Sequence, residues 1–289
     1  MKKSTKYRTW KLKVDGRAEH FLPSALTCFA AANKRQLVCD EMKVQFIGAG
    51  EAGAAEEDED DEDHTSRMWA MLMRQLCDPT HGLFERCVPA DAASSLVPCA
   101  RVDEDSERHR HVGRVILRAL LDSRRLPKEF VAGAAEGEQQ PCSFVLSYVL
   151  APNDTEEADR LSIGTCGTPR EGQAAAEADA VLETLGRVSP ALTAALRGAL
   201  DGGVSAALDG GVGAVAAEVC GGEATREARA RAVCLYVHGQ LIGVRRAALE
   251  ALKEGFTAQL DMRAALRLFQ PHELLSLFCA EHDDHEVRS

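Results

Sequence analysis

The fold of this chain is decided by the stretch VGRVILRAL at residues 112–120. Its apolar side chains recur at the spacing of one face of an α-helix: Val112, Val115, Ile116, Ala119 and Leu120. Gly113 destabilises a helix relative to alanine, so its presence favours a close approach of a second helix at that point. The stretch therefore predicts a buried helix in tight contact with another.

Similar patterns extend outward in both directions. They predict helices over 24–36 with Pro23 just ahead, over 68–76 ended by Asp78-Pro79, over 190–200, over 225–256 with breaks near Gly239 and Gly243, and from Pro271 onward. Ser189-Pro190 supplies an N-cap and a first-turn proline for the helix at 190–200, and Asp201-Gly202-Gly203 stops it. Most of the chain is thus expected to be helical.

Two short segments alternate apolar and polar residues as half-buried strands do. These are Trp10, Leu12 and Val14 in the first, and Met42, Val44 and Phe46 in the second. The acidic run at 56–63 predicts a solvated loop, and 151–173 predicts an irregular insertion because it is rich in Gly, Pro and polar residues. The predicted class is α+β, mainly helical.

Composition limits the functions open to the chain. Its 289 residues carry a net charge of −11, so nucleic acid is an unfavourable general partner. The basic run between Lys2 and Lys13 is either a solvated arm or strand edge, or a localisation or nucleic-acid patch. No apolar run has the length of a membrane span, about 18 residues, and no secretory leader follows the basic start. We therefore expect an intracellular, cytoplasmic protein, with a nuclear location left open.

Neither a metal nor a cofactor is expected. The ten cysteines include no Cys-x-x-Cys pair, and the glycine-rich segments lack the lysine of a P-loop. The pairs His109-x-His111 and His282-x-x-His285 are more typical of solvated surface histidines than of ligands.

Three blocks in a fixed order resemble the N-lobe of HECT-type ubiquitin ligases: CDPTHGLF at 77–84, HVGRVILRAL at 111–120 and FQPHELLSLFC at 269–279. The resemblance implies a large helical subdomain with a few short strands and a small inserted subdomain. This chain departs from the family pattern at Ala49, Arg118 and Ala280, where the family has Glu, Gly and Gly. The acidic loop also replaces a Gly-Gly turn.

The resemblance implies a division of the chain. The chain would begin with a basic arm at 1–9 and a first part of the large subdomain at 10–150, which includes an acidic loop at 51–63. An irregular insertion at 151–179 comes next. A small subdomain at 180–222, a second part of the large subdomain at 223–280 and an acidic tail at 281–289 follow.

The resemblance further implies that the small subdomain recruits a ubiquitin-charged conjugating enzyme. Ubiquitin and a protein substrate would then be the other partners. By position the docking helix would be 190–200, with Leu192, Leu196, Ala199 and Leu200 as the apolar contact. The alternative is that this stripe packs on its own domain.

The family's chemistry is covalent catalysis by a cysteine on a second lobe. Only ten residues follow Cys279, so that lobe is not expected here, and no catalytic residue is assigned. Cys28, within LPSALTCF at 22–29, imitates the family's catalytic motif, but Leu26 stands where that motif has His. Read as a helix, the same segment makes Cys28 an inert core neighbour. The rival to a ligase N-lobe is a non-catalytic helical scaffold or interaction module.

Overall fold

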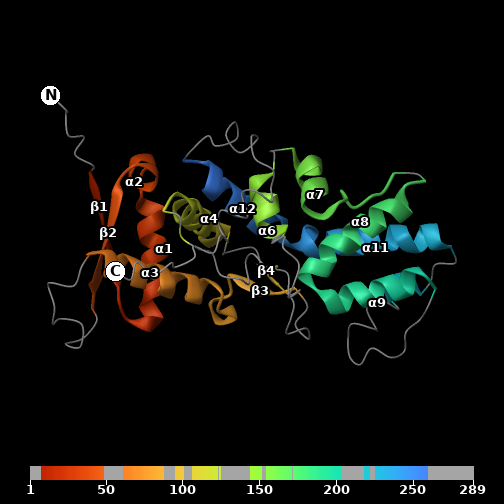
Figure 1. Ribbon diagram of the computed structural model, residues 1–289, viewed down its shortest axis with the longest axis horizontal. Helices are drawn as coiled ribbons and strands as arrows, with labels where there is room; N and C mark the ends of the chain where they lie inside the picture. The colour runs from red at the N-terminus through yellow and green to blue at the C-terminus, as the bar shows by residue number, and fades with distance from the viewer. Residues whose placement is uncertain are drawn as a thin grey trace, which may run out of the picture.

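The computed structural model describes residues 8–48, 61–87, 95–100, 106–122, 124, 144–151, 154–170, 172–202, 218–221 and 225–259. Within these ranges the protein is mainly helical, with two small two-stranded sheets (Figure 1). The predicted α+β class is confirmed at this level. The predicted last helix from Pro271, the third block and both charged termini fall outside the described residues.

The first sheet pairs β1 (Thr9–Asp15) with β2 (Glu41–Ile47) in parallel, with Thr9 opposite Glu41. Both strands were predicted. The alternation of apolar and polar residues in β1 reflects one buried and one exposed face, as expected. The side chains of Trp10, Leu12 and Val14 are buried toward α1 (Ala18–Ala31), while the residues between them are exposed. Figure 1 shows this sheet at one end of the molecule, with α1 beside it.

The helix predicted over 24–36 differs from the structure. α1 begins at Ala18 and continues through Pro23, and a separate helix, α2 (Lys34–Val38), starts after Asn33. The Asn33 side chain accepts from the Gln36 N–H, and the Gln36 side chain accepts from the Asn33 N–H, a capping box that ends one helix and begins the next.

The acidic run also differs in part from its predicted loop. α3 (Asp61–Leu76) begins within it, and its last three acids form the first helical residues. α3 packs on β2, and its end before Asp78-Pro79 agrees with the prediction.

A short connection links α3 to the central helices. Asp78 caps the 3₁₀ turn η2 (Pro79–His81), and Gly82 follows at φ +67°, a left-handed conformation that favours glycine. β3 (Phe84–Arg86) then pairs antiparallel with β4 (Leu96–Pro98).

The central layer consists of α4 (Ser106–Leu121), α6 (Phe144–Leu150) and α12 (Arg246–Thr257). α4 contains the stretch at 112–120, and its packing on α12 is the tightest described. A methyl group at Gly113 would lie 2.1 Å from the Leu252 carbonyl oxygen. The close approach predicted from Gly113 is confirmed.

The other end of the molecule is a helical bundle of α8 (Ala174–Val188), α9 (Pro190–Leu200) and α11 (Arg226–Leu241), flanked by α7 (Thr155–Ile163) (Figure 1). α7 and α8 correct the predicted irregular segment at 151–179. α11, which follows the boundary expected near residue 222, packs on α8 and α9, which precede it.

The break in the long helical region lies at Ile242 and the 3₁₀ turn η3 (Gly243–Arg245), whereas Gly239 remains inside α11. A methyl group on Gly239 would meet no atom within 4 Å, so the cost of this glycine is confined to backbone entropy. Among the described helices, none combines the length and apolar character needed to cross a membrane.

Candidate functional site

The apolar stripe of α9 lies inside the bundle. Leu192 is 4%, Leu196 0%, Ala199 9% and Leu200 2% exposed. A partner protein would have to displace the surrounding helices to contact them. The structure therefore supports the second interpretation of the stripe, in which it packs on its own domain.

Local chemistry explains why α9 buries so much of its surface. Ser189 caps the helix through a 3.4 Å hydrogen bond from the Leu192 N–H, and Pro190 occupies the first turn, as predicted. Arg229 of α11 donates to the Leu200 carbonyl at 2.9 Å and closes the other end. Both ends are thus tied into the bundle.

Cys28 occupies a structural position on α1. Its thiol donates to the Lys13 carbonyl oxygen at 3.2 Å, and burial raises its pKa. A cysteine nucleophile requires the opposite shift, since the thiolate is the reactive form. Leu26 and Phe29 beside it are buried core residues, as the helical interpretation expected.

The first sequence block contacts α4, the helix that contains the second block. The His109 Nε2 lies 2.9 Å from the Leu83 carbonyl oxygen, and the His109 ring contacts Phe84 edge to face. On the other side of α4, Arg114 donates to the Phe29 and Ala30 carbonyls at the end of α1. These contacts tie both blocks to one core.

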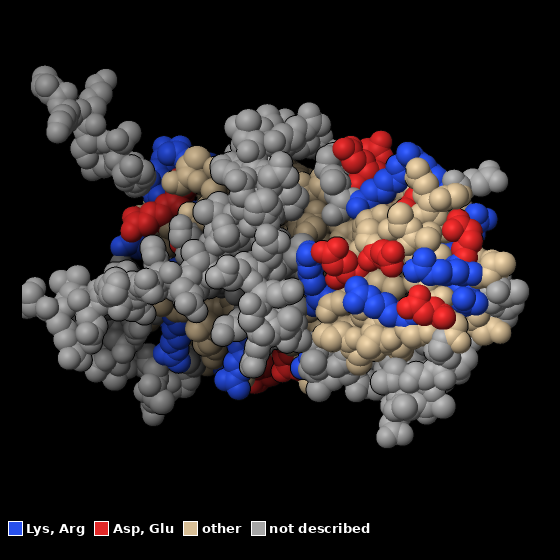
Figure 2. All heavy atoms as spheres, turned by 45° about the vertical axis from the view of Figure 1, so that its right-hand side comes forward, with Lys and Arg blue, Asp and Glu red and all other residues tan. Residues whose placement is uncertain are grey.

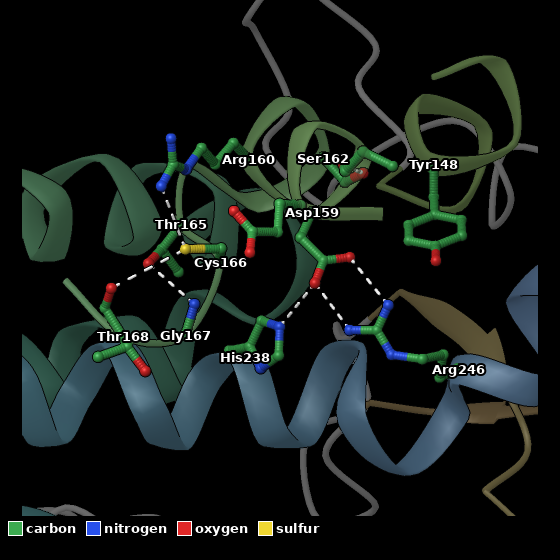
Figure 3. Close-up of polar contacts among 12 residues, drawn as sticks. Tyr148, Asp159, Arg160, Ser162, Thr165, Cys166, Gly167, Thr168, His238 and Arg246 are labelled. Atoms are coloured by element: carbon green, nitrogen blue, oxygen red, sulfur yellow. Dashed lines mark hydrogen bonds and ion pairs between the residues drawn. The ribbon is translucent and has the colours of Figure 1, made fainter. Parts of the chain in front are cut away.

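A polar cluster centred on the buried Asp159 joins the inserted helix α7 to α11 and α12 (Figure 3). The Asp159 carboxylate, 4% exposed, lies 2.8 Å from the His238 Nε2 and 2.7 Å from an Arg246 guanidinium nitrogen. A second Arg246 nitrogen lies 3.4 Å from the other carboxylate oxygen. Asp159 therefore holds two partners that come from different helices.

Electrostatics favour the ionised form of Asp159. Burial alone would raise its pKa, but the hydrogen bonds from His238 and Arg246 outweigh burial, and the net pKa is lowered. The same carboxylate raises the pKa of Arg246. Nearby, the Tyr148 hydroxyl donates to Glu250 at 2.5 Å. Burial together with this hydrogen bond raises the pKa of Tyr148.

A loop after α7 covers the histidine. Gly167, at φ +94°, lies so close that a methyl group there would be 2.9 Å from the His238 Nδ1. Thr165 holds the loop by donating to Glu177 at 3.0 Å and accepting from the Gly167 N–H at 3.2 Å. The loop packs directly over the His238 ring.

Potential nucleophiles near the cluster are engaged elsewhere. The Ser162 hydroxyl donates to the Ala158 carbonyl of its own helix, and the Cys166 sulfur lies 3.4 Å from an Arg160 nitrogen and 3.8 Å from the Thr168 carbonyl oxygen. A general base needs a hydrogen-bonded nucleophile to activate. The arrangement is instead that of a structural cross-link holding α7 on the bundle.

Sequence reasoning missed this cluster. Asp159 and His238 are 79 residues apart, and Asp159 and Arg246 are 87 apart. One signal was available in the sequence. Asp154 is a residue type typical of a helix N-cap, so it could have predicted α7 and placed Asp159 on that helix. Its pairing with α11 and α12 depends on tertiary packing.

The charged surface over the bundle has no single sign. Figure 2 shows Lys and Arg side chains interspersed with Asp and Glu on this face. Within the described ranges no cluster of metal-ligating side chains occurs, and His109 is buried rather than a solvated surface residue.

No known protein-family model matches the chain, and no curated protein is similar enough to count as a relative.

Proposed function

We propose that this protein is a HECT N-lobe-like module that docks a ubiquitin-charged conjugating enzyme and does not itself accept ubiquitin. The observation that supports this most is the contact of the first block with the helix that contains the second, at the Leu83–His109 hydrogen bond, on the same helix as the close crossing at Gly113. Residues whose order resembles the family form one packed core, as a shared N-lobe architecture requires.

The docking surface must differ from the stripe on α9, because that stripe is buried. We place it on the exposed side of the same bundle, at Leu235 of α11. Leu235 is 50% exposed, and Arg231 and Ala232 border it in a shallow surface hollow of about 440 Å³. A half-exposed leucine next to a cation offers an apolar contact with a polar rim.

Binding to a panel of charged conjugating enzymes, followed by NMR or interferometry, tests this placement. Leu235→Asp should weaken binding about tenfold, which is about 1.4 kcal/mol. Val244→Asp is the matched control, since Val244 is 45% exposed but lies in η3. If both substitutions weaken binding equally, Leu235 is not part of the interface.

A second function follows from the same bundle. The burial of all four predicted docking residues and the structural use of Cys28 fit a helical scaffold that has lost enzyme docking. Absence of binding to every charged conjugating enzyme at high concentration, with the chain folded, would favour this scaffold.

The chemical part of the proposal has its own test. Incubation with charged conjugating enzyme should leave no adduct on the chain that a reducing agent releases, because the Cys28 thiol has a raised pKa. A thiol-sensitive ubiquitin adduct that disappears in Cys28→Ser would contradict it.

A further inference from the structure

The outer edge of β1 presents backbone groups that the sheet does not use. The Glu41 N–H donates to the Arg8 carbonyl at 3.0 Å, and the Gly16 N–H donates to the Ile47 carbonyl at 2.8 Å. Hydrogen bonding alternates along a parallel strand, so every second residue of β1 faces β2. The backbone groups of the residues between them point away from β2: Thr9, Lys11, Lys13 and Asp15.

Helix α1 covers one end of this edge. Ser24 accepts from the Asp15 N–H at 3.0 Å, and Cys28, one turn later, donates to the Lys13 carbonyl at 3.2 Å. Among the residues that the structure describes, none forms a hydrogen bond with the backbone of Thr9 or Lys11. No part of the chain that the structure describes therefore covers the first half of this edge.

The side chains beside the open edge are mainly basic. Lys11 and Lys13 are exposed on the outer face of the sheet, and Lys43 lies directly opposite Lys11 in the register. Glu41, opposite Thr9, is the one carboxylate within the strand pairs from Thr9 to Lys13. A carboxylate placed beside this part of the strand would meet the exposed ammonium groups of Lys11 and Lys13.

We propose that this edge binds an extended peptide of alternating acidic and apolar residues as a third strand. The peptide backbone would pair with Thr9 and Lys11, its acidic side chains would lie beside Lys11 and Lys13, and its apolar side chains would lie on the side of Trp10. A two-stranded sheet is marginal alone, so a third strand also extends its packed face.

A nucleic acid or an anionic membrane could meet the lysines but has no strand backbone to pair with Thr9 and Lys11, so the unpaired edge favours a peptide. The inference does not depend on docking of a conjugating enzyme, because β1 and the α8–α9–α11 bundle lie at opposite ends of the molecule (Figure 1).

Fluorescence anisotropy with a labelled Glu-Val repeat peptide and the full chain provides the test. We expect saturable binding at about 50 mM salt that weakens at about 500 mM, because exposed charges are screened. A peptide N-methylated on the amides of one edge keeps every carboxylate but cannot pair as a strand. It should bind about tenfold more weakly or worse.

Variants of the chain separate the contribution of backbone pairing from the contribution of the lysine charges. Lys11→Pro removes an N–H that faces away from β2, so it should abolish strand addition while circular dichroism stays unchanged. Lys11→Gln with Lys13→Gln should weaken binding and its salt dependence, and Lys34→Gln on α2 is the matched control.

Two outcomes would overturn the proposal. Equal binding of the N-methylated and unmodified peptides would mean that charge alone attracts them. No binding at about 50 mM salt would mean that the lysines merely protect the edge from aggregation, as charged side chains on edge strands often do. The N-methylated comparison uses the unaltered chain, so it decides the matter even if Lys11→Pro fails to fold.

Discussion

Gly255 of α12 lies against the backbone of Arg110 on α4, so close that a methyl group on Gly255 would be 1.8 Å from the Arg110 carbonyl oxygen. The same crossing brings Gly113 of α4 onto Leu252. Each helix thus contributes a glycine to its partner's backbone, and the two helices approach more closely than any side chain permits. This contact organises the central layer.

Gly255→Ala and Gly113→Ala should each destabilise the protein by about 3 kcal/mol. The added methyl group meets backbone atoms, which cannot move aside as a flexible side chain would, so the two helices must separate. Urea unfolding followed by circular dichroism measures the change in the free energy of unfolding.

Gly239→Ala is the control for this pair. Gly239 also lies within a helix, but a methyl group there meets no atom within 4 Å. Alanine should therefore stabilise α11 by about 0.5–1 kcal/mol through its higher helix propensity. A similar loss at all three glycines would show that close packing is not the cause.

Asp159→Asn should destabilise the protein by about 2 kcal/mol near neutral pH, because Arg246 would lose its ionic partner in a largely buried site. Asp201→Asn is the control, since Asp201 is exposed and lies 3.6 Å from Arg226; it should change little. Thermal or urea unfolding of both variants gives the comparison.

The contribution of Asp159 should also depend on pH. Its pKa is lower in the folded protein than its ordinary value of 3.8, so the unfolded chain binds the proton more readily. The stabilisation is therefore complete above that ordinary value and is lost as the pH falls through the folded pKa. The difference between wild type and Asp159→Asn should shrink as the pH falls below about 4. A difference that grows on acidification would contradict this assignment.

Cys28 should react slowly with iodoacetamide. Burial raises its pKa and its thiol is engaged with the Lys13 carbonyl, whereas Cys39 is exposed and serves as the internal control. Peptide mapping by mass spectrometry at several times should show Cys39 modified first. Faster labelling of Cys28 would point to an activated thiol.

Pro23→Ala should stabilise α1 by about 1–2 kcal/mol. Pro23 lies within the helix, where it removes the hydrogen bond to the residue four positions earlier. Pro190→Ala is the matched control, because Pro190 begins α9 and its missing N–H costs nothing there. That change should be slightly destabilising, through greater freedom of the unfolded chain. The unfolding midpoints of the two variants show whether each substitution raises or lowers the stability of the protein.

Local patterns predicted elements that depend on near neighbours. The alternation at Trp10, Leu12 and Val14 predicted β1, and Ser189-Pro190 predicted the start of α9. Pro23 misled the prediction of α1, because a proline usually marks a helix boundary, while here the buried side chains of Phe21 and Leu22 extend the helix before it.

The predicted docking stripe shows what such local patterns cannot predict, namely which surface an apolar stripe packs against. An apolar stripe with Leu196 at its centre has the same spacing whether it faces a partner protein or its own domain. α8 and α11 settle the direction by covering it, and neither helix can be placed on α9 from sequence spacing.

The sequence by itself determined the local elements of this protein: the strand alternation, the helix caps and the need for close packing at Gly113. These depend on residues within a few turns of one another. Only the tertiary structure decided that Gly113 meets α12, that Asp159 pairs with His238 and Arg246, and that Leu192 and Leu196 are interior. Each of these joins segments far apart in the chain, whose meeting depends on how all the helices bury their apolar faces together.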